Sequence, residues 1–540
     1  MDTFDYVIAG AGSAGCVLAN RLSADPNNRV LLLEGGGRDN WIWFHIPVGY
    51  LFAIGNPRAD WMFSTTPQPG LGERSLGYPR GKVLGGSSAI NAMIYMRGQA
   101  ADYDHWRQLG LTGWGWEDVL PAFLAHEDHT DGAGPFHAAG GELRVEHPRI
   151  HWPVLDLVRD AAEAAGIGKV ADFNTGDNAG SAYFQVNQRA GRRWSAARGF
   201  LKPVMGRPNL SVVTGAQIDR VLLKDGRATG IAYARDGQTV VAGVRAEVVL
   251  CAGAVGTPLI LERSGIGDGE RLARFGVECR HHVPGVGENL QDHLQIRPIY
   301  KVSGIGTLNS RYRNLFSRAA MGIDYALRRR GPLTMAPSQV GAFAKSSSRY
   351  ATANLEFHFQ PLSLDNWGEG LHPFDAITAS VCNLRPTSRG SIHASGAAPG
   401  DAPIIDPNYL ATEEDRRVAV EALTLARTIM AQPPLARHAP EELKPGTDVT
   451  GKDALLAAAQ ALGTTIFHPV GTAKMGAKDD KMAVLDERLR LRGLDGLRVA
   501  DASVMPTITS GNTNAPTMMI AEKAAAMIAQ DRRRAASSRA

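Results

Sequence analysis

The sequence predicts an α/β protein in which a Rossmann-like nucleotide-binding domain is joined to a second domain with a mainly antiparallel sheet flanked by helices. Two observations predict the first domain: a glycine-rich loop separates an apolar run from a helical pattern near the N-terminus, and a second apolar run ends at Glu34. The second domain is predicted from strand-like runs at residues 355–359 and 376–381 and a helical pattern over residues 416–430.

Length and composition are those of a globular chain with more than one domain. A chain of 540 residues is too long to fold around one simple hydrophobic core. Its contents of 44% hydrophobic and 21% charged residues are ordinary for a globular protein. The net charge is +4 and the basic residues are scattered, which argues against nucleic-acid binding. The tail at residues 532–540, which begins with three arginines, is expected to be a disordered end.

Cysteine spacing and hydropathy give no sign of a metal site or a membrane span. The four cysteines are far apart and form no CxxC pair, so neither a zinc site nor a disulfide framework is expected. No signal-peptide pattern precedes the apolar run at residues 4–8, and no stretch of 18 apolar residues occurs. We therefore expect a cytoplasmic protein with no metal and no stable membrane insertion.

The first motif is a strand–turn–helix–strand unit at residues 6–34. Its glycine loop reads Gly-Ala-Gly-Ser-Ala-Gly and lies where the first strand turns into the helix. In such a unit Gly10 makes the turn, Gly12 lets the backbone approach a pyrophosphate, and Gly15 lets helix and strand pack closely. The motif predicts a dinucleotide site.

The flanks of this loop complete the predicted site. The helix would begin near Ser13 and Ala14, where its unpaired amides face the phosphates. Glu34 ends the second strand and is placed to accept hydrogen bonds from the adenosine ribose hydroxyls. An acid there repels a 2′-phosphate, which disfavours NADP.

A second glycine-rich run lies at residues 81–91 and reads Gly-Lys-Val-Leu-Gly-Gly-Ser-Ser-Ala-Ile-Asn. Adjacent glycines and serines let backbone amides press against a flat ring, where a Cβ would clash. Asn91 adds a neutral donor and acceptor just beyond it. This run resembles the first signature of the glucose–methanol–choline (GMC) family of flavin oxidoreductases.

Further runs are similar to the same family, in the same order along the chain. Residues 253–267 look like the second GMC signature, with a tight turn, a helix started by proline and a glycine-capped end. Residues 284–293 form another family-like segment, which we expect to be a packed loop between domains. The C-terminal runs at residues 468–476, 497–506 and 511–517 also match.

The resemblance implies FAD as the cofactor and assigns roles by position. It implies that His468 lies in front of the flavin, that Asp501 lies near the ribityl–phosphate region, and that Asn512 is the partner of the histidine. Some relatives tether FAD through a histidine at the position of Ile90, so here the flavin is expected to be bound non-covalently. The expected cofactor-binding residues are Gly10, Gly12, Ser13, Ala14, Gly15, Glu34, Val83, Gly86, Ser87, Asn91, Ala92, Ile94, Ile218, Asp501, Ala502 and Asn512.

The expected reaction is oxidation of an alcohol to an aldehyde or ketone, with hydride transfer to flavin N5. Because imidazole is available as a base near neutral pH, His468 is expected to take the hydroxyl proton while Asn512 orients the substrate oxygen. Ser87 and Ser88 either tune the flavin near N5 or serve packing. The expected partners are a small-molecule alcohol and an electron acceptor, either oxygen or a quinone-like molecule.

Other side chains have two readings. His358 is on a strand-like run, where a lone histidine is more often structural, although one that faces inward could line the pocket. The aromatic cluster at residues 41–45 and Trp61 are candidates for a cover over the flavin, although packing alone would explain them.

The substrate class is only weakly marked. The substrate domain shows no acidic residue grouped with aromatic residues, the arrangement that would indicate binding of a quaternary ammonium such as choline. Phe467 makes the wall beside His468 apolar. A neutral primary alcohol (aryl, polyol or glycol) is therefore expected over choline. A lyase similar to hydroxynitrile lyases, without net redox chemistry, and a non-catalytic or photochemical flavoprotein remain as alternatives. The choice between oxidase and dehydrogenase and the oligomeric state stay open.

The expected domains are discontinuous in sequence. The FAD-binding domain would comprise residues 1–150, which include the flavin cover, residues 190–300, and residues 461–540, which carry the catalytic pair. The substrate domain would comprise residues 151–189 and 301–460. No repeat or low-complexity linker separates the two, so they are expected to share one compact body.

Overall fold

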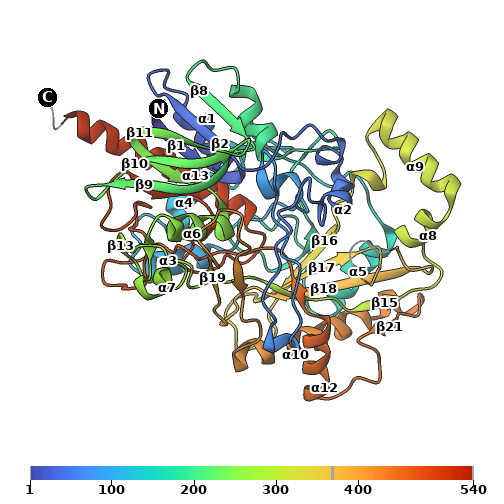
Figure 1. Ribbon diagram of the computed structural model, residues 1–540. Coiled ribbons are helices and arrows are strands. Elements are labelled where there is room, and N and C mark those ends of the chain that lie inside the picture. The colour runs from blue at the N-terminus through green and yellow to red at the C-terminus, as the bar shows by residue number, and fades with distance from the viewer. Residues whose placement is uncertain (1, 366–369, 538–540) are drawn as a thin grey trace.

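The computed structural model describes residues 2–365 and 370–537, which form two β-sheets with helices around them (Figure 1). Within these residues the first sheet has seven strands in the order β8-β2-β1-β11-β10-β9, with β23 paired to β11. Its strands are β1 (Thr3–Ala9), β2 (Val30–Glu34), β8 (Leu210–Thr214), β9 (Gln217–Lys224), β10 (Arg227–Arg235), β11 (Gln238–Leu250) and β23 (Leu497–Val499).

The first sheet is parallel where the glycine loop leaves it. β1 runs parallel to β2 and to the second half of β11, while β8 and β23 extend the parallel part outward. The first half of β11 instead pairs antiparallel with β10, which pairs with β9. All five residues of β2 are buried, as expected for a strand covered on both faces. The carboxyl ends of β1, β2 and β11 therefore meet at one edge, where ligands bind in such sheets.

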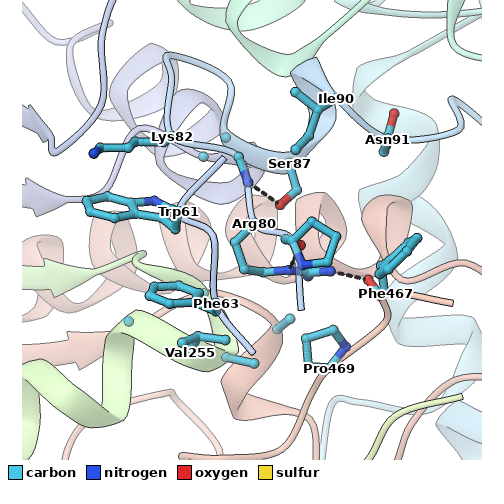
Figure 2. Close-up of a pocket in the computed structure, with 18 of the residues that line it drawn as sticks. Trp61, Phe63, Arg80, Lys82, Ser87, Ile90, Asn91, Val255, Phe467 and Pro469 are labelled. Atoms are coloured by element: carbon cyan, nitrogen blue, oxygen red, sulfur yellow. Dashed lines mark hydrogen bonds between the residues drawn. The ribbon is translucent and has the colours of Figure 1, made fainter. Parts of the chain in front are cut away.

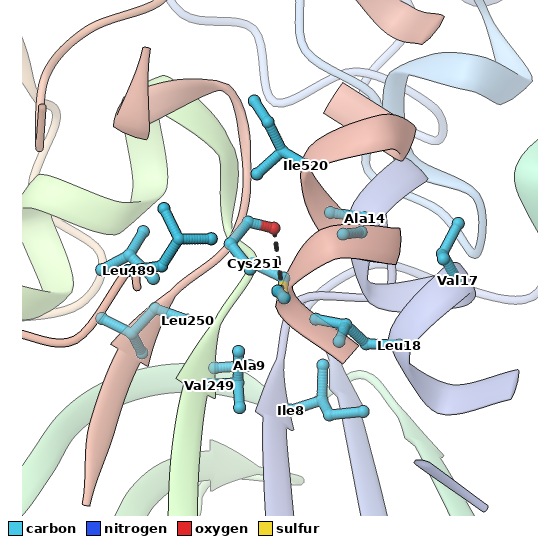
Figure 3. Packing of buried hydrophobic residues seen from close by; sticks show 14 of the residues in the cluster. Ile8, Ala9, Ala14, Val17, Leu18, Val249, Leu250, Cys251, Leu489 and Ile520 are labelled. Atoms are coloured by element: carbon cyan, nitrogen blue, oxygen red, sulfur yellow. Dashed lines mark hydrogen bonds between the residues drawn. The ribbon is translucent and has the colours of Figure 1, made fainter. Parts of the chain in front are cut away.

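Helices α1 (Ser13–Leu22) and α13 (Asn514–Ser537) pack side by side on this sheet. Val17 and Leu18 of α1, Ile520 of α13 and the apolar side chains of β1 and β11 belong to one buried cluster, part of which Figure 3 shows. The first and last parts of the chain thus share one hydrophobic core.

The C-terminal tail is helical, so the expectation of a disordered end is wrong for residues 532–537; residues 538–540 lie outside the described part of the chain. Asp531 fixes the helix just before the run of arginines, because its carboxylate pairs with Arg488 at 2.8 Å and with Arg490 at 2.7 Å. Arg532 reaches Asp25 at 3.4 Å. These long-range ion pairs give the helix partners that the tail sequence alone does not reveal.

The second sheet is antiparallel throughout, and with the first it confirms the predicted α/β class. Within the described residues its eight strands follow the order β21-β15-β18-β17-β16-β5, with β14 bridging β18 and β22. They are β5 (Gly180–Tyr183), β14 (Leu294–Ile296), β15 (Ile299–Lys301), β16 (Val340–Ala344), β17 (Leu355–Gln360), β18 (Ala376–Asn383), β21 (Glu441–Lys444) and β22 (Thr464–Thr465).

Helices α5 (Pro153–Ala164) and α10 (Glu413–Met430) pack on this second sheet, and α12 (Lys452–Leu462) packs on α10. The predicted helix at residues 416–430 begins earlier, at Glu413, because the Thr412 hydroxyl accepts a hydrogen bond from the Asp415 amide at 3.2 Å. The five-segment domain division stays a prediction, although β14, placed in the first domain by that division, pairs within the second sheet.

Helix α6 (Gly253–Arg263) follows β11 and starts earlier than expected. It begins at Gly253, so Pro258 lies inside the helix and does not start it. Proline cannot donate to the carbonyl four residues before it, but the Thr472 hydroxyl donates to the Ala254 carbonyl at 2.6 Å and replaces that bond. Gly265, just beyond the helix, has a φ of +80°, as expected for a glycine-capped end.

The other α-helices and the small sheets of the described residues lie around these two sheets. Further helices are α2 (Tyr50–Ala53), α3 (Ala100–Gln108), α4 (Trp116–His126), α7 (Gly269–Arg274), α8 (Leu308–Arg313), α9 (Leu315–Arg328) and α11 (Pro433–Ala436). Small sheets pair β3 (Glu127–His129) with β4 (Leu143–Val145), β6 (Gln188–Arg189) with β7 (Arg192–Arg193), β12 (Ile266–Gly267) with β13 (His281–His282), and β19 (Ser391–His393) with β20 (Ile404–Asp406). Of the helices described, none has the length and apolar character needed to cross a bilayer.

Candidate active site

A cavity of about 700 Å³ lies between the two sheets and is lined from both (Figure 2). It runs from the glycine loop after β1 to the residues around His468, and His358 of β17 forms part of its wall. Most residues predicted from the sequence line it. These are Gly10, Gly12, Ser13, Ala14, Glu34, Gly86, Ser87, Asn91, Ala92, Ile94, Ile218, His468, Asp501, Ala502 and Asn512.

The glycine loop leaves open space at the start of α1. Gly10 has a φ of +107°, and a Cβ there would lie 2.5 Å from the Cys251 carbonyl oxygen, so only glycine fits. At Gly12, by contrast, a Cβ would meet that oxygen at 3.9 Å and nothing closer. The amides at the N-terminus of α1 therefore border a space that a pyrophosphate could fill.

Two predicted residues, Gly15 and Val83, do not line the cavity. A Cβ on Gly15 would lie 1.9 Å from the Gly10 carbonyl oxygen, so this glycine packs α1 against the loop. Val83 is buried in a small apolar cluster, and its backbone forms a bridge to Gly37. Both residues act on the site through packing.

Glu34 lies buried at the end of β2, on the cavity wall. Its carboxylate oxygens accept hydrogen bonds from the amides of Ala11 at 2.9 Å and Gly36 at 2.7 Å. Burial outweighs these two bonds and raises the pKa of Glu34 to about 7. Each oxygen keeps a further lone pair, so the side chain can still accept from a ligand hydroxyl.

Asp501, which follows β23, holds the first turn of α6. Its carboxylate accepts from the Gly253 amide at 2.8 Å and the Thr257 hydroxyl at 2.6 Å, and also from the amide and hydroxyl of Ser503. Burial raises the pKa of Asp501 in spite of these bonds. The residue thus places the N-terminus of α6 at the cavity wall.

His468 and Asn512 meet at the far end of the cavity. Asn512 Nδ2 lies 3.0 Å from His468 Nε2, and His293 Nδ1 lies 3.1 Å from His468 Nδ1. His293 Nε2 lies 3.1 Å from the Leu384 carbonyl oxygen, which can only accept. With both rings neutral, His293 carries its proton on Nε2, so His468 donates from Nδ1 and its Nε2 is unprotonated.

Burial keeps His468 neutral. Loss of solvent lowers its pKa well below the usual value; a proton on His293 or His358 would lower it further, and the charge of Arg80 adds to this effect. The backbone amide of His468 donates to Asp292 at 2.8 Å, so the residue is held through its main chain as well as its ring.

The residue before His468 has a strained backbone. Phe467 has a φ of +71°, which side-chain-bearing residues rarely adopt. Its amide donates to the Thr465 hydroxyl at 2.8 Å, and its carbonyl accepts from Arg80 at 2.7 Å (Figure 2). Such strain persists only where the surroundings over-determine it, and here it orients the next residue, His468.

Sequence reasoning missed two contributors. The segment at residues 284–293 was expected only to pack between domains, yet its last two residues, Asp292 and His293, both hold His468. In the sequence, the adjacent acid and histidine at the end of residues 284–293 were the one feature that could have indicated this role. Of the two readings given for His358, the structure supports the second: the residue lines the cavity, and its Nε2 lies 3.1 Å from Glu356.

The structure separates the aromatic and serine residues that had two interpretations into those that line the cavity and those that do not. Trp61 and Ser87 line the cavity, whereas the aromatic cluster at residues 41–45 is outside its described lining. Ser88 serves packing, because its hydroxyl donates to the Gly85 carbonyl at 2.6 Å and accepts from the Ala196 amide at 3.0 Å.

One group in the described residues could reach a common metal ion: the ligand atoms of Glu356, His358 and Cys382 lie within 4.8 Å of one another. Their own contacts account for this arrangement, since Glu356 lies 3.1 Å from His358 and 3.9 Å from the Cys382 thiol. That no metal takes part stays a prediction.

Neutral polar side chains line the His468 end of the cavity together with the charged Arg80. Gln295, Ser338 and Gln360 line it, and the Gln360 amide donates to the Ser338 hydroxyl at 3.1 Å. Within the described residues, the buried carbonyl oxygens of Gln360 and Asn512 have no hydrogen-bond partner. Because unpaired buried acceptors are costly, both point to a ligand that donates hydrogen bonds.

Comparison with known proteins shows an end-to-end likeness. The GMC oxidoreductase family models match residues 4–295 and 386–521. The chain is 42% identical over 530 residues to an alcohol dehydrogenase (acceptor) of Pseudomonas putida, covering 97% of this chain and 95% of that one. It is 38% identical to the mitochondrial choline dehydrogenase of Mus musculus, covering 98% and 89%. The solved pyridoxine 4-oxidase from Mesorbium loti matches with a TM-score of 0.88 at 33% identity, covering 98% and 99%.

Proposed function

The chain belongs to the GMC oxidoreductase family and is an FAD-dependent alcohol oxidoreductase, and we propose that it oxidises a neutral primary alcohol with His468 as the base. The observation that carries the proposal is the setting of His468: its ring is buried, which lowers its pKa, and its Nε2 lies 3.0 Å from Asn512 Nδ2. A nitrogen in that setting is what the removal of a hydroxyl proton requires.

We propose that the residues along the cavity hold FAD without a covalent bond. The open space at Gly12 and the amides of α1 suit the pyrophosphate, and Glu34 suits the ribose hydroxyls. Ile90 occupies the cavity wall beside Ser87 (Figure 2) and has no nucleophilic atom that could form a tether. When bound, FAD supplies the hydride acceptor.

The chain's own residues handle the proton and the substrate oxygen. The alcohol hydroxyl gives its proton to His468 Nε2 while the carbinol hydrogen leaves as hydride, so the alcohol becomes the carbonyl product. Asn512 Nδ2 lies beside the same nitrogen and would donate to the substrate oxygen as negative charge builds there. His293 keeps the ring of His468 in place by accepting from Nδ1.

The substrate class follows from the neutral polar wall. Gln295, Ser338 and Gln360 offer hydrogen bonds without charge, which suits an aryl alcohol, polyol or glycol. The choline dehydrogenase of Mus musculus acts on a cation, but the acids among the described lining residues are Glu34, Asp401 and Asp501. Glu34 and Asp501 hold the backbone around the nucleotide site, and Asp401 belongs to a loop bonded to Gln217. The electron acceptor is either oxygen or a quinone-like molecule.

The test is anaerobic visible spectroscopy of the FAD-loaded enzyme against neutral alcohols, choline and sugars. We expect a neutral primary alcohol to bleach the flavin band, and choline to do so at least about 100-fold more slowly. Choline as the fastest substrate would contradict the substrate class, whereas no bleaching by any alcohol would favour a lyase. Admitting air afterwards separates an oxidase from a dehydrogenase.

The proposed base is tested in the same assay with His468→Ala. This variant should keep bound FAD but lose flavin reduction by about 10²-fold or more. His147→Ala is the matched control, because His147 is exposed and pairs with Asp131 on the surface. Reduction at the normal rate in His468→Ala would exclude His468 as the base.

A further inference from the structure

The segment formed by α8 and α9, residues 308–330, exposes large apolar side chains. In α9, Phe316 is 88% exposed, Leu327 is 78% exposed and Ile323 is 60% exposed. Figure 1 shows α9, in yellow-green, standing out from the body of the molecule. Such residues are usually buried, and a contiguous exposed set marks an interaction site.

The exposed side chains form one stripe along α9. Phe316, Ile323 and Leu327 follow at spacings of seven and four residues, which places them on one face of a helix. Tyr325 comes about two and a half turns after Phe316, on the opposite face. It is buried there, and its hydroxyl donates to the Gly191 carbonyl at 3.1 Å. Helix α9 is thus anchored by its inner face and turns its apolar face away from the protein.

Basic side chains accompany this stripe. The segment holds one acid, Asp324, which lies 3.6 Å from Arg328. Of its six arginines, Arg311, Arg313 and Arg329 contact Trp152, the Pro373 carbonyl and Tyr325 of the protein, whereas Arg318, Arg328 and Arg330 are exposed. A helix with an apolar face and many arginines is typical of segments that lie in the plane of a membrane surface. Arginine attracts anionic headgroups there while its stem packs along apolar surface.

We propose that α8 and α9 form a docking surface for an anionic lipid bilayer. The apolar stripe would enter the boundary between headgroups and acyl chains, and the arginines would meet the lipid phosphates. The 14 residues of α9 are too few to cross a bilayer, so the helix would lie along its surface. A second copy of this chain suits the stripe less well, because it would bring two surfaces with the same excess of arginine together.

The docking surface adjoins walls of the cavity. Helix α9 leads into a turn at Pro332–Thr334, shortly before Pro337, which lines the cavity. That turn packs against the turn that precedes α2. In α2, Tyr50 lines the cavity while Phe52 is exposed to solvent. Docking would therefore bring the cavity wall that carries Tyr50 and Pro337 toward the lipid.

The test is co-sedimentation of the FAD-loaded enzyme with vesicles of phosphatidylcholine, with or without added phosphatidylglycerol. We expect binding to the anionic vesicles, loss of binding in high salt, and about tenfold weaker binding for the Phe316→Glu/Leu327→Glu variant. Arg318→Gln/Arg330→Gln should weaken binding to the anionic vesicles in particular. Leu109→Glu, which changes an exposed leucine next to α3 on the other side of the molecule (Figure 1), should bind like the unchanged enzyme.

Flavin absorbance verifies that each variant is folded, and the arginine variant and the salt series test the proposal even if the double glutamate variant fails to fold. Enzyme that stays in the supernatant with both kinds of vesicle would overturn the proposal. Equal binding by the stripe variant and the unchanged enzyme would overturn it as well. Sedimentation velocity tests whether a second copy of the chain covers the apolar stripe instead. If the enzyme does not bind vesicles but forms a dimer that Phe316→Glu/Leu327→Glu abolishes, the stripe is a dimer interface and the lipid proposal is overturned.

Discussion

His293 Nδ1 lies 3.1 Å from His468 Nδ1, and this contact decides which nitrogen of His468 can act as a base. Because the other nitrogen of His293 faces the Leu384 carbonyl, His293 can accept only at Nδ1. The proton of His468 is therefore held on the side away from Asn512. A buried ring from a distant part of the sequence sets the chemical state of the proposed base.

Replacing His293 tests this positioning role. His293→Leu leaves the Nδ1–H of His468 buried without an acceptor, so we expect kcat to fall about 10- to 100-fold with little change in KM. The acidic limb of the pH profile should move to higher pH, because a proton on His293 disfavours protonation of His468 and the variant loses this effect. His293→Asn can accept at Oδ1 and should recover part of the loss. Equal losses in both variants with an unmoved pH profile would reduce His293 to a structural role.

The depressed pKa of His468 predicts the pH dependence of the reaction. Nε2 of His468 stays unprotonated until the pH falls well below the ordinary histidine value of 6.5. The rate of flavin reduction should therefore be constant through pH 6.5 and decrease only at clearly lower pH, where His468 gains a proton. Unfolded His468 gains its proton first, so this residue also makes the free energy of unfolding decrease as the pH falls below about 6.5. Stopped-flow reduction across pH is the measurement. An acidic limb at or above pH 6.5 would contradict the depressed pKa.

For His137 we expect the opposite pH dependence of the free energy of unfolding. His137 lies 2.7 Å from Asp172 and 3.1 Å from Glu127, and these bonds outweigh partial burial and raise its pKa to about 9. Its stabilising contribution is thus fully present below about pH 6.5 and lost as the pH rises through 9. His137→Asn should lower the free energy of unfolding by roughly 2 kcal/mol at low pH and by almost nothing at high pH.

Urea unfolding at two pH values measures the effect of His137→Asn. His147→Asn is the control, because this exposed histidine pairs with Asp131 on the surface, where an ion pair contributes at most about 1 kcal/mol. A His137→Asn effect that does not change with pH would show that the ion pairs do not carry its contribution.

The Thr472 hydroxyl replaces the helix hydrogen bond that Pro258 cannot donate to Ala254, and a double-mutant cycle can test this replacement. Thr472→Val should cost about 1–3 kcal/mol, since it leaves the buried Ala254 carbonyl without a donor. Pro258→Ala restores the backbone N–H four residues after Ala254, so this change should rescue Thr472→Val while having a small effect alone. Unfolding free energies of the four proteins give the coupling. Additive effects would mean that the threonine hydroxyl and the helix bond do not substitute for each other.

The sequence was informative where chemistry is local. The glycine loop, the start of α1 and the acid at Glu34 follow one another within a short stretch, and turn, helix and strand signals all agree there. His468 and Asn512 were identified through the family resemblance, and the structure brings their side chains within 3.0 Å of each other.

Contacts between distant segments were the part that the sequence could not supply. His293 and His468 are 175 positions apart, and no local periodicity connects them. The early start of α6 depends on Thr472, which is 218 positions from the carbonyl that it serves. The helical tail likewise depends on ion pairs of Asp531 with Arg488 and Arg490. Each miss was a tertiary contact overriding a local preference.

The packing of α1 against α13 fixes the order of events during protein synthesis. Ser13, the first residue of α1, donates to Asn514, the first residue of α13, at 2.7 Å across 501 positions of the chain. Arg21 and Glu522 pair between the same two helices at 2.7 Å. The nucleotide-binding loop leaves the ribosome long before α13, which supplies Asn514 and Thr517 to the wall of its site. The apolar face of α1 therefore stays uncovered until α13 has emerged, so completion of the cofactor site follows the synthesis of α13.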